Sequence, residues 1–462
     1  MNIAARRVAL ALLLMLTASV GASAQARLQS DYVPRAAMAR AQRMGNMAST
    51  APVALALTLP WRNAAQLNEL LRRQQDPRDP QFGRYLTPQQ FMAQFGPTQS
   101  DYNAVRAWAR GQGLKITGTH PNRLILDVEG AAQTVQTALA VRLGQYQTAQ
   151  GRVFRAAENA PQLPPTVAGV AGLNQLAVRR PRAREAFARP ASIGSGPRGG
   201  LTPADIRKAY NLSSTGLDGT GQTLAVFELA DYKQIDIDAY AAQFGLNSVP
   251  RQNILVDGGA AVPADGSDEA TLDIELQLAL APGASKILVY QGPNSDAGVL
   301  DTYNKIATDN IAKQISTSWG SPESTVDAPT LNAEYAIFQQ MAAQGQTIYS
   351  ASGDFGAFDD GKTLSVDDPG SQPFVCAVGG TRLSVTGPGG TYTGETTWND
   401  GSPADGASGG GVSAVWPLPS YQQGVVSAAS GGSGTMRNVP DVVLNAAPDT
   451  GYAIYYNGGW HV

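Results

Sequence analysis

The stretch Ser267–Gly292, "SDEATLDIELQLALAPGASKILVYQG", combines a helix pattern with a strand pattern. Its first part repeats leucines at helical spacing, with Ser267 placed to cap the helix and Pro282-Gly283 placed to end it. Its second part, Lys286–Gly292, is a short apolar run of the kind that forms a buried strand. A helix followed at once by such a strand is typical of an α/β sheet.

The same alternation continues on both sides of this stretch. Further strand-like runs are "QTLAVFEL" (222–229), "QNILVDG" (252–258), "KQISTSWG" (313–320), "QTIYSASGD" (346–354) and "PFVCAVGGT" (373–381). Helical stretches such as "DAPTLNAEYAIFQQMAAQG" (327–345) lie between them. This pattern predicts a doubly wound α/β domain over 201–462, with a parallel sheet covered on both faces. Ligand chemistry in such domains gathers at the carboxyl ends of the strands.

The N-terminal half predicts a separate, smaller domain within residues 25–177. Strand-like runs such as "PVALALTLPW" (52–61) alternate with helices, one of which Thr87 is placed to cap. We expect a small ferredoxin-like α+β sandwich that carries no catalytic cluster. Residues 178–200 are rich in Arg, Pro, Gly and Ser, which predicts an exposed linker that is easily cleaved. A spacer without a processing role is the alternative.

Residues 1–24 have the features of a signal peptide. Two arginines precede an apolar run that ends in the small-residue site Ala22-Ser23-Ala24. We therefore expect an exported, monomeric protein that is not bound to a membrane once this segment is removed. The single cysteine, Cys376, excludes an intramolecular disulfide and is expected to be a buried structural thiol. Since the chain has only two histidines, a zinc site and a cysteine nucleophile are both disfavoured.

The formal net charge of -3 hides an uneven distribution. Residues 1–198 hold 24 Lys and Arg against 9 Asp and Glu, a net charge of +15, whereas residues 199–462 hold 10 against 28, a net charge of -18. The arginines of the first half are scattered, and an exported protein meets little nucleic acid, so we expect no nucleic-acid partner. The sequence predicts instead that the two halves bind each other.

Two acids of the opening helix, Glu269 and Asp273, fall on its apolar face. At 100° per residue both lie with the leucines of the helix, whereas Asp268 and Glu275 point away and can reach solvent. Two non-catalytic explanations are available. Acids in the first turn of a helix ordinarily interact favourably with the helix dipole, and buried acids also form structural pairs. Two carboxylates one turn apart on a buried face repel, and burial raises the pKa of at least one of them. Such a pair can act as a general base and the group that orients it.

Three further residues lie at predicted strand ends. Asp354 in "SASGDFG" follows the strand "QTIY", although an Asx-turn residue between two glycines would look the same. Trp319 follows another strand end in "STSWGSPE", and Glu228 closes the strand "LAVFE". All three are therefore candidates for the ligand-binding edge of the sheet.

Taken together, the motifs of the chain resemble those of the sedolisin or kumamolisin family, the serine-carboxyl peptidases. The matching motifs are "RYLTPQQF" (84–91), "EATLDIE" (269–275), "SWGSPE" (318–323), "SGDFG" (352–356), "AVGGT" (377–381), "ETTWN" (395–399), "GASGGGVS" (406–413), "PSYQ" (419–422) and "RNVPDV" (437–442). The resemblance implies a subtilisin-like peptidase domain preceded by a propeptide that inhibits it intramolecularly. It also implies a secreted, acid-active endopeptidase made as a zymogen, with proteins and peptides as substrates.

The resemblance also implies roles for individual residues. Glu269 and Asp273 would join a serine in a catalytic triad, and Asp354 would help to form the oxyanion hole. Glu228 and Trp319 would position the pair of acids. The family's calcium ligands follow the nucleophilic serine, so calcium is expected only in the complete enzyme and no metal ligand is expected within residues 1–462.

The stretch "GSGTMRNVPD" (432–441) has Met436 where a Gly-Thr-Ser motif would place a nucleophile. In the family, "RNVPDV" is followed by a strand, a turn with "GGW", and only then by Gly-Thr-Ser. The resemblance therefore predicts that the match at Met436 is coincidental and that the nucleophile lies beyond Val462. We expect an incomplete copy of an enzyme that is inactive by itself, with a natural pseudoenzyme as the alternative.

Two other classes of protein are alternatives to a serine-carboxyl peptidase. A Ser-His-Asp hydrolase would need a histidine beside a serine, and the second half of the chain offers only His461. A catalytically dead, secreted binding protein on a peptidase fold is the other alternative. The row of buried carboxylates disfavours it, because a binding protein gains nothing from the cost of burying them.

Overall fold

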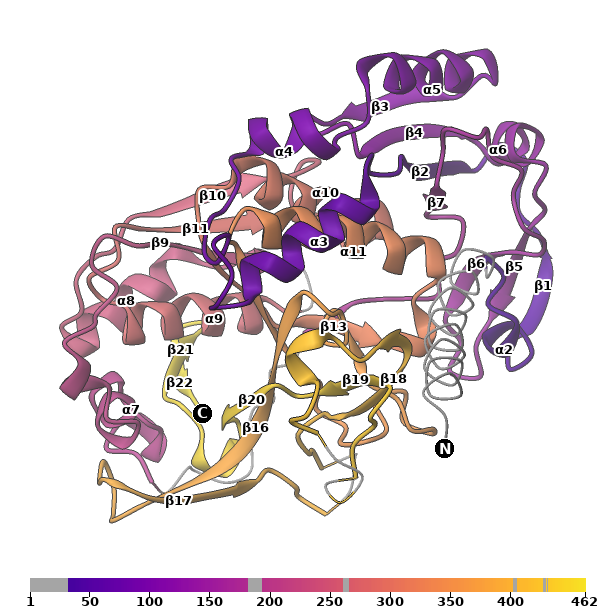
Figure 1. The fold of residues 1–462 in the computed structure, drawn as a ribbon. Helices are drawn as coiled ribbons and strands as arrows, with labels where there is room; N and C mark the ends of the chain where they lie inside the picture. The colour runs from indigo at the N-terminus through magenta and orange to yellow at the C-terminus, as the bar shows by residue number, and fades with distance from the viewer. Residues whose placement is uncertain (1–31, 182–192, 261–265, 402–404, 427–428, 430) are drawn as a thin grey trace, which may run out of the picture.

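The computed structural model describes residues 32–181, 193–260, 266–401, 405–426, 429 and 431–462. Within these ranges a smaller α+β unit comes first and packs against a larger α/β unit (Figure 1). The smaller unit consists of α2 (Arg35–Met38), β1 (Gln42–Asn46), β2 (Pro52–Thr58), α3 (Ala64–Gln75), α4 (Pro88–Phe95), α5 (Gln99–Gly111), β3 (Lys115–Thr119), β4 (Ile125–Ala131), α6 (Ala132–Leu139), β5 (Leu143–Gln147), β6 (Val153–Ala157) and β7 (Gly169–Ala171). The expected signal peptide, residues 1–24, lies outside the described ranges. None of the helices within them is long and apolar enough to cross a membrane.

The smaller unit has the strand order of a ferredoxin-like sandwich, as the sequence predicts. Its four-stranded sheet has the order β3-β4-β2-β7, and every neighbouring pair is antiparallel. Val53, Leu55 and Leu57 alternate along β2 and are buried on one face of the sheet. Thr87 caps α4 as expected: its hydroxyl accepts the N–H of Gln90, whose side chain accepts the N–H of Thr87 in return.

The larger unit alternates strands and helices. Its main elements are α7 (Pro203–Ala209), β9 (Thr223–Glu228), α8 (Gln234–Phe244), β10 (Arg251–Leu255), α9 (Ser267–Leu280), β11 (Lys286–Gln291), α10 (Asp296–Asp309), β12 (Gln314–Thr317), β13 (Trp319–Pro322), α11 (Ala328–Ala343), β14 (Thr347–Ala351), β15 (Asp367–Asp368), β16 (Val375–Val385), β17 (Tyr392–Thr397), β18 (Gly411–Pro417), β19 (Met436–Val439), β20 (Val442–Asn445), β21 (Ile454–Tyr456) and β22 (Gly459–His461). Met436 begins the strand β19 rather than a helix, so its surroundings differ from those expected of a nucleophile turn.

The central sheet of the larger unit has the order β10-β11-β9-β12-β14-β16-β17, and β20 also pairs with β16. All neighbours are parallel except β16 and β17. The chain starts in the middle at β9, forms β10 and β11 on one side, and then forms β12, β14 and β16 on the other. The doubly wound α/β class is therefore confirmed. The carboxyl ends of β9 and β12 are neighbours where the strand order turns, which is where such folds bind ligands.

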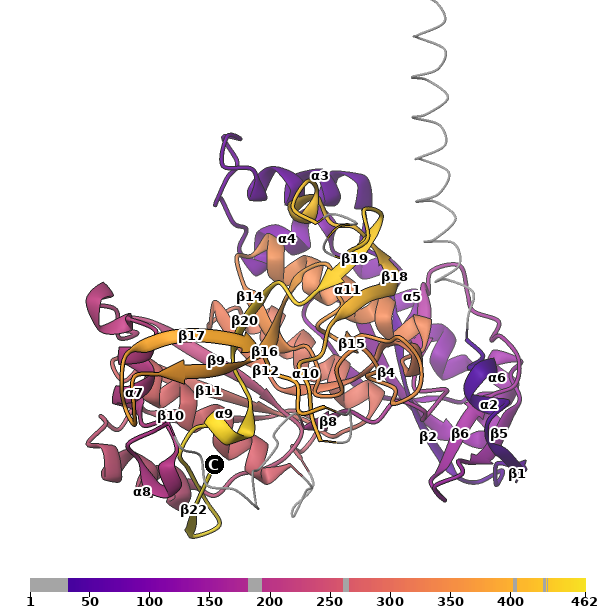
Figure 2. The ribbon, with the colours of Figure 1, turned by 90° about the horizontal axis from the view of Figure 1, so that it is seen from below.

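Helices cover the sheet on both faces. Along β11, Ile287 and Val289 pack in a cluster with α8 and α9, whereas Leu288 and Tyr290 pack in a cluster with α10 and α11. The smaller unit lies on the outside of α10 and α11, where α3 and α4 contact them (Figure 1). Its strands β1, β5 and β6 lie at one end of the molecule, and α7 and α8 lie at the other (Figure 2).

Two expectations about burial are wrong in detail. The strand β10 was expected to be covered on both faces, but it is the edge of the sheet and exposes Gln252, Asn253 and Leu255. Having only one neighbour, β11, it lacks the second layer of side chains that buries a central strand. Cys376 on β16 is half-buried rather than buried.

Candidate active site

Helix α9 brings the two predicted catalytic acids to the carboxyl edge of the sheet. Gly266 holds the N-cap position with φ of 102°, so the expectation that Ser267 caps the helix is wrong, and Ser267 is already helical. Two separate features of this position require glycine. An added Cβ would strain the backbone and would overlap the ring of Trp319.

The acids of α9 are distributed differently from the expected pattern. Glu269 is 1% exposed and Asp273 is half-buried, so both are withdrawn from water as predicted. Glu275 was expected to reach solvent, but it is fully buried. The reason is the strand β21, which packs on α9 and donates the N–H of Tyr455 to Glu275 Oε2 at 2.9 Å. Helix α9 is thus covered on more than one face.

Glu228 and Asp273 form the centre of a hydrogen-bonded chain of side chains. The indole N–H of Trp319 donates to Glu228 Oε2 at 2.8 Å, and the carboxyls of Glu228 and Asp273 hydrogen-bond each other. The hydroxyl of Ser318 donates to both oxygens of Asp273, at 2.8 and 3.0 Å. The structure therefore brings Glu228 and Trp319 to the pair on α9. Sequence reasoning missed Ser318, although it stands in the motif "SWGSPE".

The carboxyls of this cluster hold protons more tightly than free carboxyls. Burial, followed by the nearby charge of Asp273, raises the pKa of Glu228 well above its ordinary value. Burial and then the charges of Asp273, Glu228 and Asp354 raise the pKa of Glu269 in the same way. Burial raises the pKa of Asp273 to about 6, against the lowering effect of its hydrogen bonds from Ser318 and Glu228. The cluster can therefore store and exchange protons at mildly acidic pH.

Asp354 lies close to the same cluster. It follows β14 at the carboxyl edge of the sheet and is 8% exposed, and its charge contributes to the raised pKa of Glu269. Its backbone carbonyl accepts the N–H of Ala407 at 3.0 Å, which ties the loop to a distant part of the chain. The predicted site residues Glu228, Glu269, Asp273, Trp319 and Asp354 thus gather at one edge.

The beginning of the expected linker runs past this cluster and is not exposed throughout. The short strand β8 (Arg180–Pro181) pairs antiparallel with β13, and the side chain of Arg179 is only 3% exposed. Pro181 lies against Gly266, where an added Cβ would come within 3.3 Å of Pro181 Cγ. Residues 182–192, which the expected processing region includes, lie outside the described ranges.

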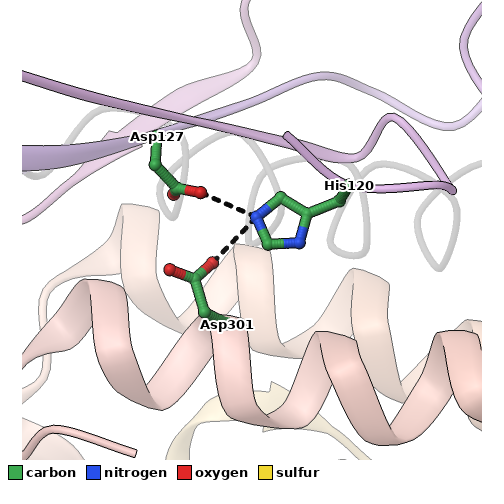
Figure 3. A group of neighbouring side chains, drawn as sticks. All are labelled: His120, Asp127 and Asp301. Carbon is green, nitrogen blue, oxygen red and sulfur yellow. Dashed lines mark hydrogen bonds and ion pairs between the residues drawn. The ribbon is translucent and has the colours of Figure 1, made fainter. Parts of the chain in front are cut away.

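Among the residues that the structure describes, one group of side chains has the make-up of a cation site. His120 and Asp127 of the smaller unit meet Asp301 of α10, with His120 Nε2 at 2.7 Å from Asp127 Oδ2 and 3.1 Å from Asp301 Oδ1 (Figure 3). Calcium prefers six to eight oxygen ligands, so one nitrogen and two carboxylates do not fit it. Burial alone lowers the pKa of His120, but hydrogen bonds with both carboxylates outweigh it and raise the pKa to about 10. The group thus behaves as an imidazolium between two acids, a contact that sequence reasoning missed.

Comparison with protein families finds matches in both units. Residues 39–175 match the pro-kumamolisin activation domain, and residues 267–459 match the subtilase family. The first match covers the smaller unit except for α2. The second covers the helix α9 and most of the sheet that follows it.

Two named peptidases are similar to most of the chain. Kumamolisin of Bacillus sp. (strain MN-32) is 36% identical over 398 residues, which cover 81% of this chain and 70% of the relative. Sedolisin of Pseudomonas sp. (strain 101) is 33% identical over 428 residues, which cover 87% and 72%. Among solved structures, Pseudomonas sedolisin complexed with two molecules of pseudo-iodotyrostatin is 33% identical, with a TM-score of 0.52 over 58% of this chain and 75% of that chain.

Proposed function

The chain belongs to the kumamolisin–sedolisin family of serine-carboxyl peptidases, and we propose that its acid cluster hydrolyses peptide bonds with a serine nucleophile from outside residues 1–462. In this proposal Glu269 is the general base and Asp273 orients it. Asp354 stabilises the oxyanion, and Glu228 and Trp319 hold Asp273 in place. The protein is proposed to be a secreted zymogen, with its activation domain as the intramolecular inhibitor of a peptidase that works at acidic pH.

One observation carries the assignment of Glu269. Its Oε2 is fully buried and makes no hydrogen bond to any residue that the structure describes. A buried oxygen without a partner is costly, and the charges of Asp273, Glu228 and Asp354 add to the cost of ionising Glu269. A serine hydroxyl donating to this oxygen would remove that cost. It would also place the nucleophile at its base.

The proposed reaction follows from these contacts. The serine hydroxyl passes its proton to Glu269 as its oxygen attacks the peptide carbonyl carbon, and protonated Asp354 donates a hydrogen bond to the oxyanion that forms. Glu269 then gives the proton to the leaving amine, and the C–N bond breaks to leave an acyl-enzyme. Glu269 then takes a proton from the water that attacks the ester carbonyl, and it returns this proton to the serine oxygen as the ester C–O bond breaks and the acid product leaves. Asp273 acts on Glu269 through its charge, and the hydrogen bonds from Ser318 and Glu228 hold Asp273 in place.

The same contacts suggest how the zymogen is kept inactive. Glu269 can accept a proton only when it is ionised, and burial holds its pKa well above the ordinary value. Pro181 lies against Gly266, the N-cap of the helix that carries Glu269, so this segment covers the start of α9. Removal of the segment would admit water and lower the pKa of Glu269, so the base would become available after release of the activation domain.

The test is to replace Glu269 by Gln in a form of the peptidase that includes the proposed serine nucleophile. We expect peptide hydrolysis and self-processing to fall by about 100- to 10,000-fold, which is the usual contribution of a general base. The matched control is Asp268→Asn, since Asp268 is the neighbouring acid on α9 but is not proposed to touch the serine.

Comparable activity of Glu269→Gln and Asp268→Asn would contradict the assignment. An unmodified protein that hydrolyses no peptide would favour the alternative of a dead binding protein, which the comparisons with named peptidases do not support.

A further inference from the structure

A buried acidic pocket of the peptidase unit encloses the side chain of Arg179. Its Nη1 lies 2.6 Å from Asp296 Oδ1, and its Nη2 lies 3.0 Å from Glu334 Oε1. The three side chains are 3%, 8% and 1% exposed. Asp296 begins α10 and Glu334 lies in α11, so two helices of the larger, peptidase unit form the pocket, and the segment that follows the smaller, activation unit fills it.

The backbone around Arg179 is held in the way that peptidases hold extended peptides. Asn294 donates its side-chain N–H to the carbonyl of Arg179 at 2.7 Å, and the hydroxyl of Ser321 donates to the carbonyl of Val178 at 3.0 Å. The next two residues pair with β13 as an antiparallel strand. Main-chain pairing of this kind binds any sequence, and pockets for individual side chains supply the selectivity.

The bound segment leads directly to the proposed catalytic acids. Pro181, two residues after Arg179, lies against Gly266, the N-cap of the helix that carries Glu269 and Asp273. A substrate bound along β13 in the same direction would therefore place a side chain in the Arg179 pocket. The residues that follow would then approach the reacting groups.

The charges of the pocket require a cation. Burial alone lowers the pKa of Arg179, but Glu334 and Asp296 outweigh it and keep the guanidinium charged. A third buried acid, Asp368, hydrogen-bonds Glu334 and accepts the side-chain N–H of Gln372 at 3.0 Å; burial, followed by the charge of Glu334, raises the pKa of Asp368 well above its ordinary value. If Arg179 left with the activation unit, these acids would lose their counter-ion while still withdrawn from water. Such buried charges are strongly unfavourable when one partner is removed.

We propose that this pocket is a substrate subsite of the mature peptidase that selects arginine, and that Arg179 occupies it in the zymogen as the side chain of a bound substrate would. The inference rests on the proposed function. Arginine fits better than lysine, because its planar guanidinium offers separate nitrogens to acids on two different helices, whereas an ammonium offers a single charged atom on a shorter stem. Neutral side chains would leave Asp296 and Glu334 uncompensated.

The first test compares peptides that differ only at the position corresponding to Arg179. The matured enzyme is expected to cleave the arginine peptide with a kcat/KM at least about tenfold higher than that of the glutamine peptide. We expect this ratio because arginine gains a charge-assisted contact that glutamine lacks. Glu334→Gln is expected to bring this ratio close to one. Equal cleavage of the two peptides, or a ratio that Glu334→Gln leaves unchanged, would overturn the proposal.

The second test needs no activity, so it separates this inference from the proposed function. Arg179→Ala in the full chain should lower Tm, and millimolar methylguanidinium should restore it by refilling the pocket. Tetramethylammonium at the same ionic strength should not restore the Tm of Arg179→Ala. Neither salt should stabilise the control Arg180→Ala, because Arg180 is the exposed neighbour in the same segment. If methylguanidinium raised the Tm of Arg179→Ala no more than tetramethylammonium does, the pocket would not select a guanidinium. That result would overturn the proposal whatever the enzyme assay shows.

Discussion

Among individual side chains, the buried acids of α9 differ in what compensates for their burial. Asp273 accepts one hydrogen bond that the Ser318 hydroxyl shares between its two oxygens and another from Glu228. Glu275 accepts only the N–H of Tyr455, and its second oxygen has no hydrogen-bond partner among the described residues. Burial raises the pKa of Glu275 to about 9, despite the lowering effect of that hydrogen bond. Glu275 therefore remains protonated at neutral pH.

This raised pKa predicts a pH dependence of stability. The folded state binds the proton of Glu275 more tightly than the unfolded state does, so the contribution of this group to stability is greatest below its ordinary pKa of 4.5. It is lost progressively as pH rises toward 9. Glu275→Gln keeps an acceptor for Tyr455 without the charge, so it should flatten the decline of Tm between about pH 5 and about pH 8, measured by scanning calorimetry.

The control for Glu275→Gln is Glu69→Gln, which changes an exposed acid on α3. Near pH 7 we expect Glu275→Gln to raise Tm by a few degrees, since about 1 kcal/mol corresponds to about 2–4 °C in a domain of this size. A Tm profile parallel to that of the unmodified protein would show that Glu275 is not the buried acid responsible.

The junction between α9 and β13 depends on a single glycine. Gly266 allows the ring of Trp319 to pack over the first turn of the helix, where its indole N–H reaches Glu228. The helix start, the strand β13 and the end of β9 are therefore positioned by one contact. Backbone conformation and close packing both demand glycine here, because φ is 102° and the space for a Cβ is taken.

Replacement of Gly266 by Ala should destabilise the fold by more than backbone strain alone. Gly258 is a matched control, since it also has positive φ, of 90°, but an added Cβ there would meet nothing within 4 Å. We expect a cost of about 1–2 kcal/mol for Gly258→Ala from strain. Gly266→Ala should cost a further 1–3 kcal/mol or so from overpacking against Trp319. Equal losses in urea unfolding would show that the Trp319 contact is not tight.

Between the two units, apolar packing contributes more of the described contacts than charge does. Trp61, Leu71 and Phe91 of the smaller unit share one buried cluster with Phe338 and Met341 of α11. Ion pairs that cross the same boundary involve His120 and Arg179. Attraction between the +15 and -18 halves stays a prediction, because exposed charges act over a range that salt shortens.

Trp61→Ala tests which contribution dominates. The indole packs edge-on against Phe91 and donates to the carbonyl of Ala336 at 2.9 Å, so its removal should cost about 3–5 kcal/mol of docking and folding stability. Hydrogen exchange of the amides of α11 should accelerate accordingly. The control Arg72→Ala removes an exposed ion pair of α3 with Glu69 and should change little. If salt accelerated this exchange as much as Trp61→Ala does, charge would be the main cause of docking.

Local sequence patterns were sufficient for the class of fold and for two of the catalytic candidates. Short apolar runs that alternate with helices report the burial of strands within a covered parallel sheet, because each strand meets helices on both faces. Glu269 and Asp273 are one helical turn apart, so their common face follows from the helix alone. The order of the motifs was also enough to identify the family.

Contacts between distant segments were decided only by the tertiary structure. Periodicity reports which face of an element is apolar, but not which element will cover it, so the burial of Glu275 by β21 could not be read from α9. Arg179 appeared to belong to an exposed linker because its neighbours are polar, yet acids on α10 and α11 enclose it. His120 meets Asp301 across 181 positions of sequence for the same reason. A charged side chain becomes buried wherever folding brings it counter-charges, and no local pattern records where those counter-charges will come from.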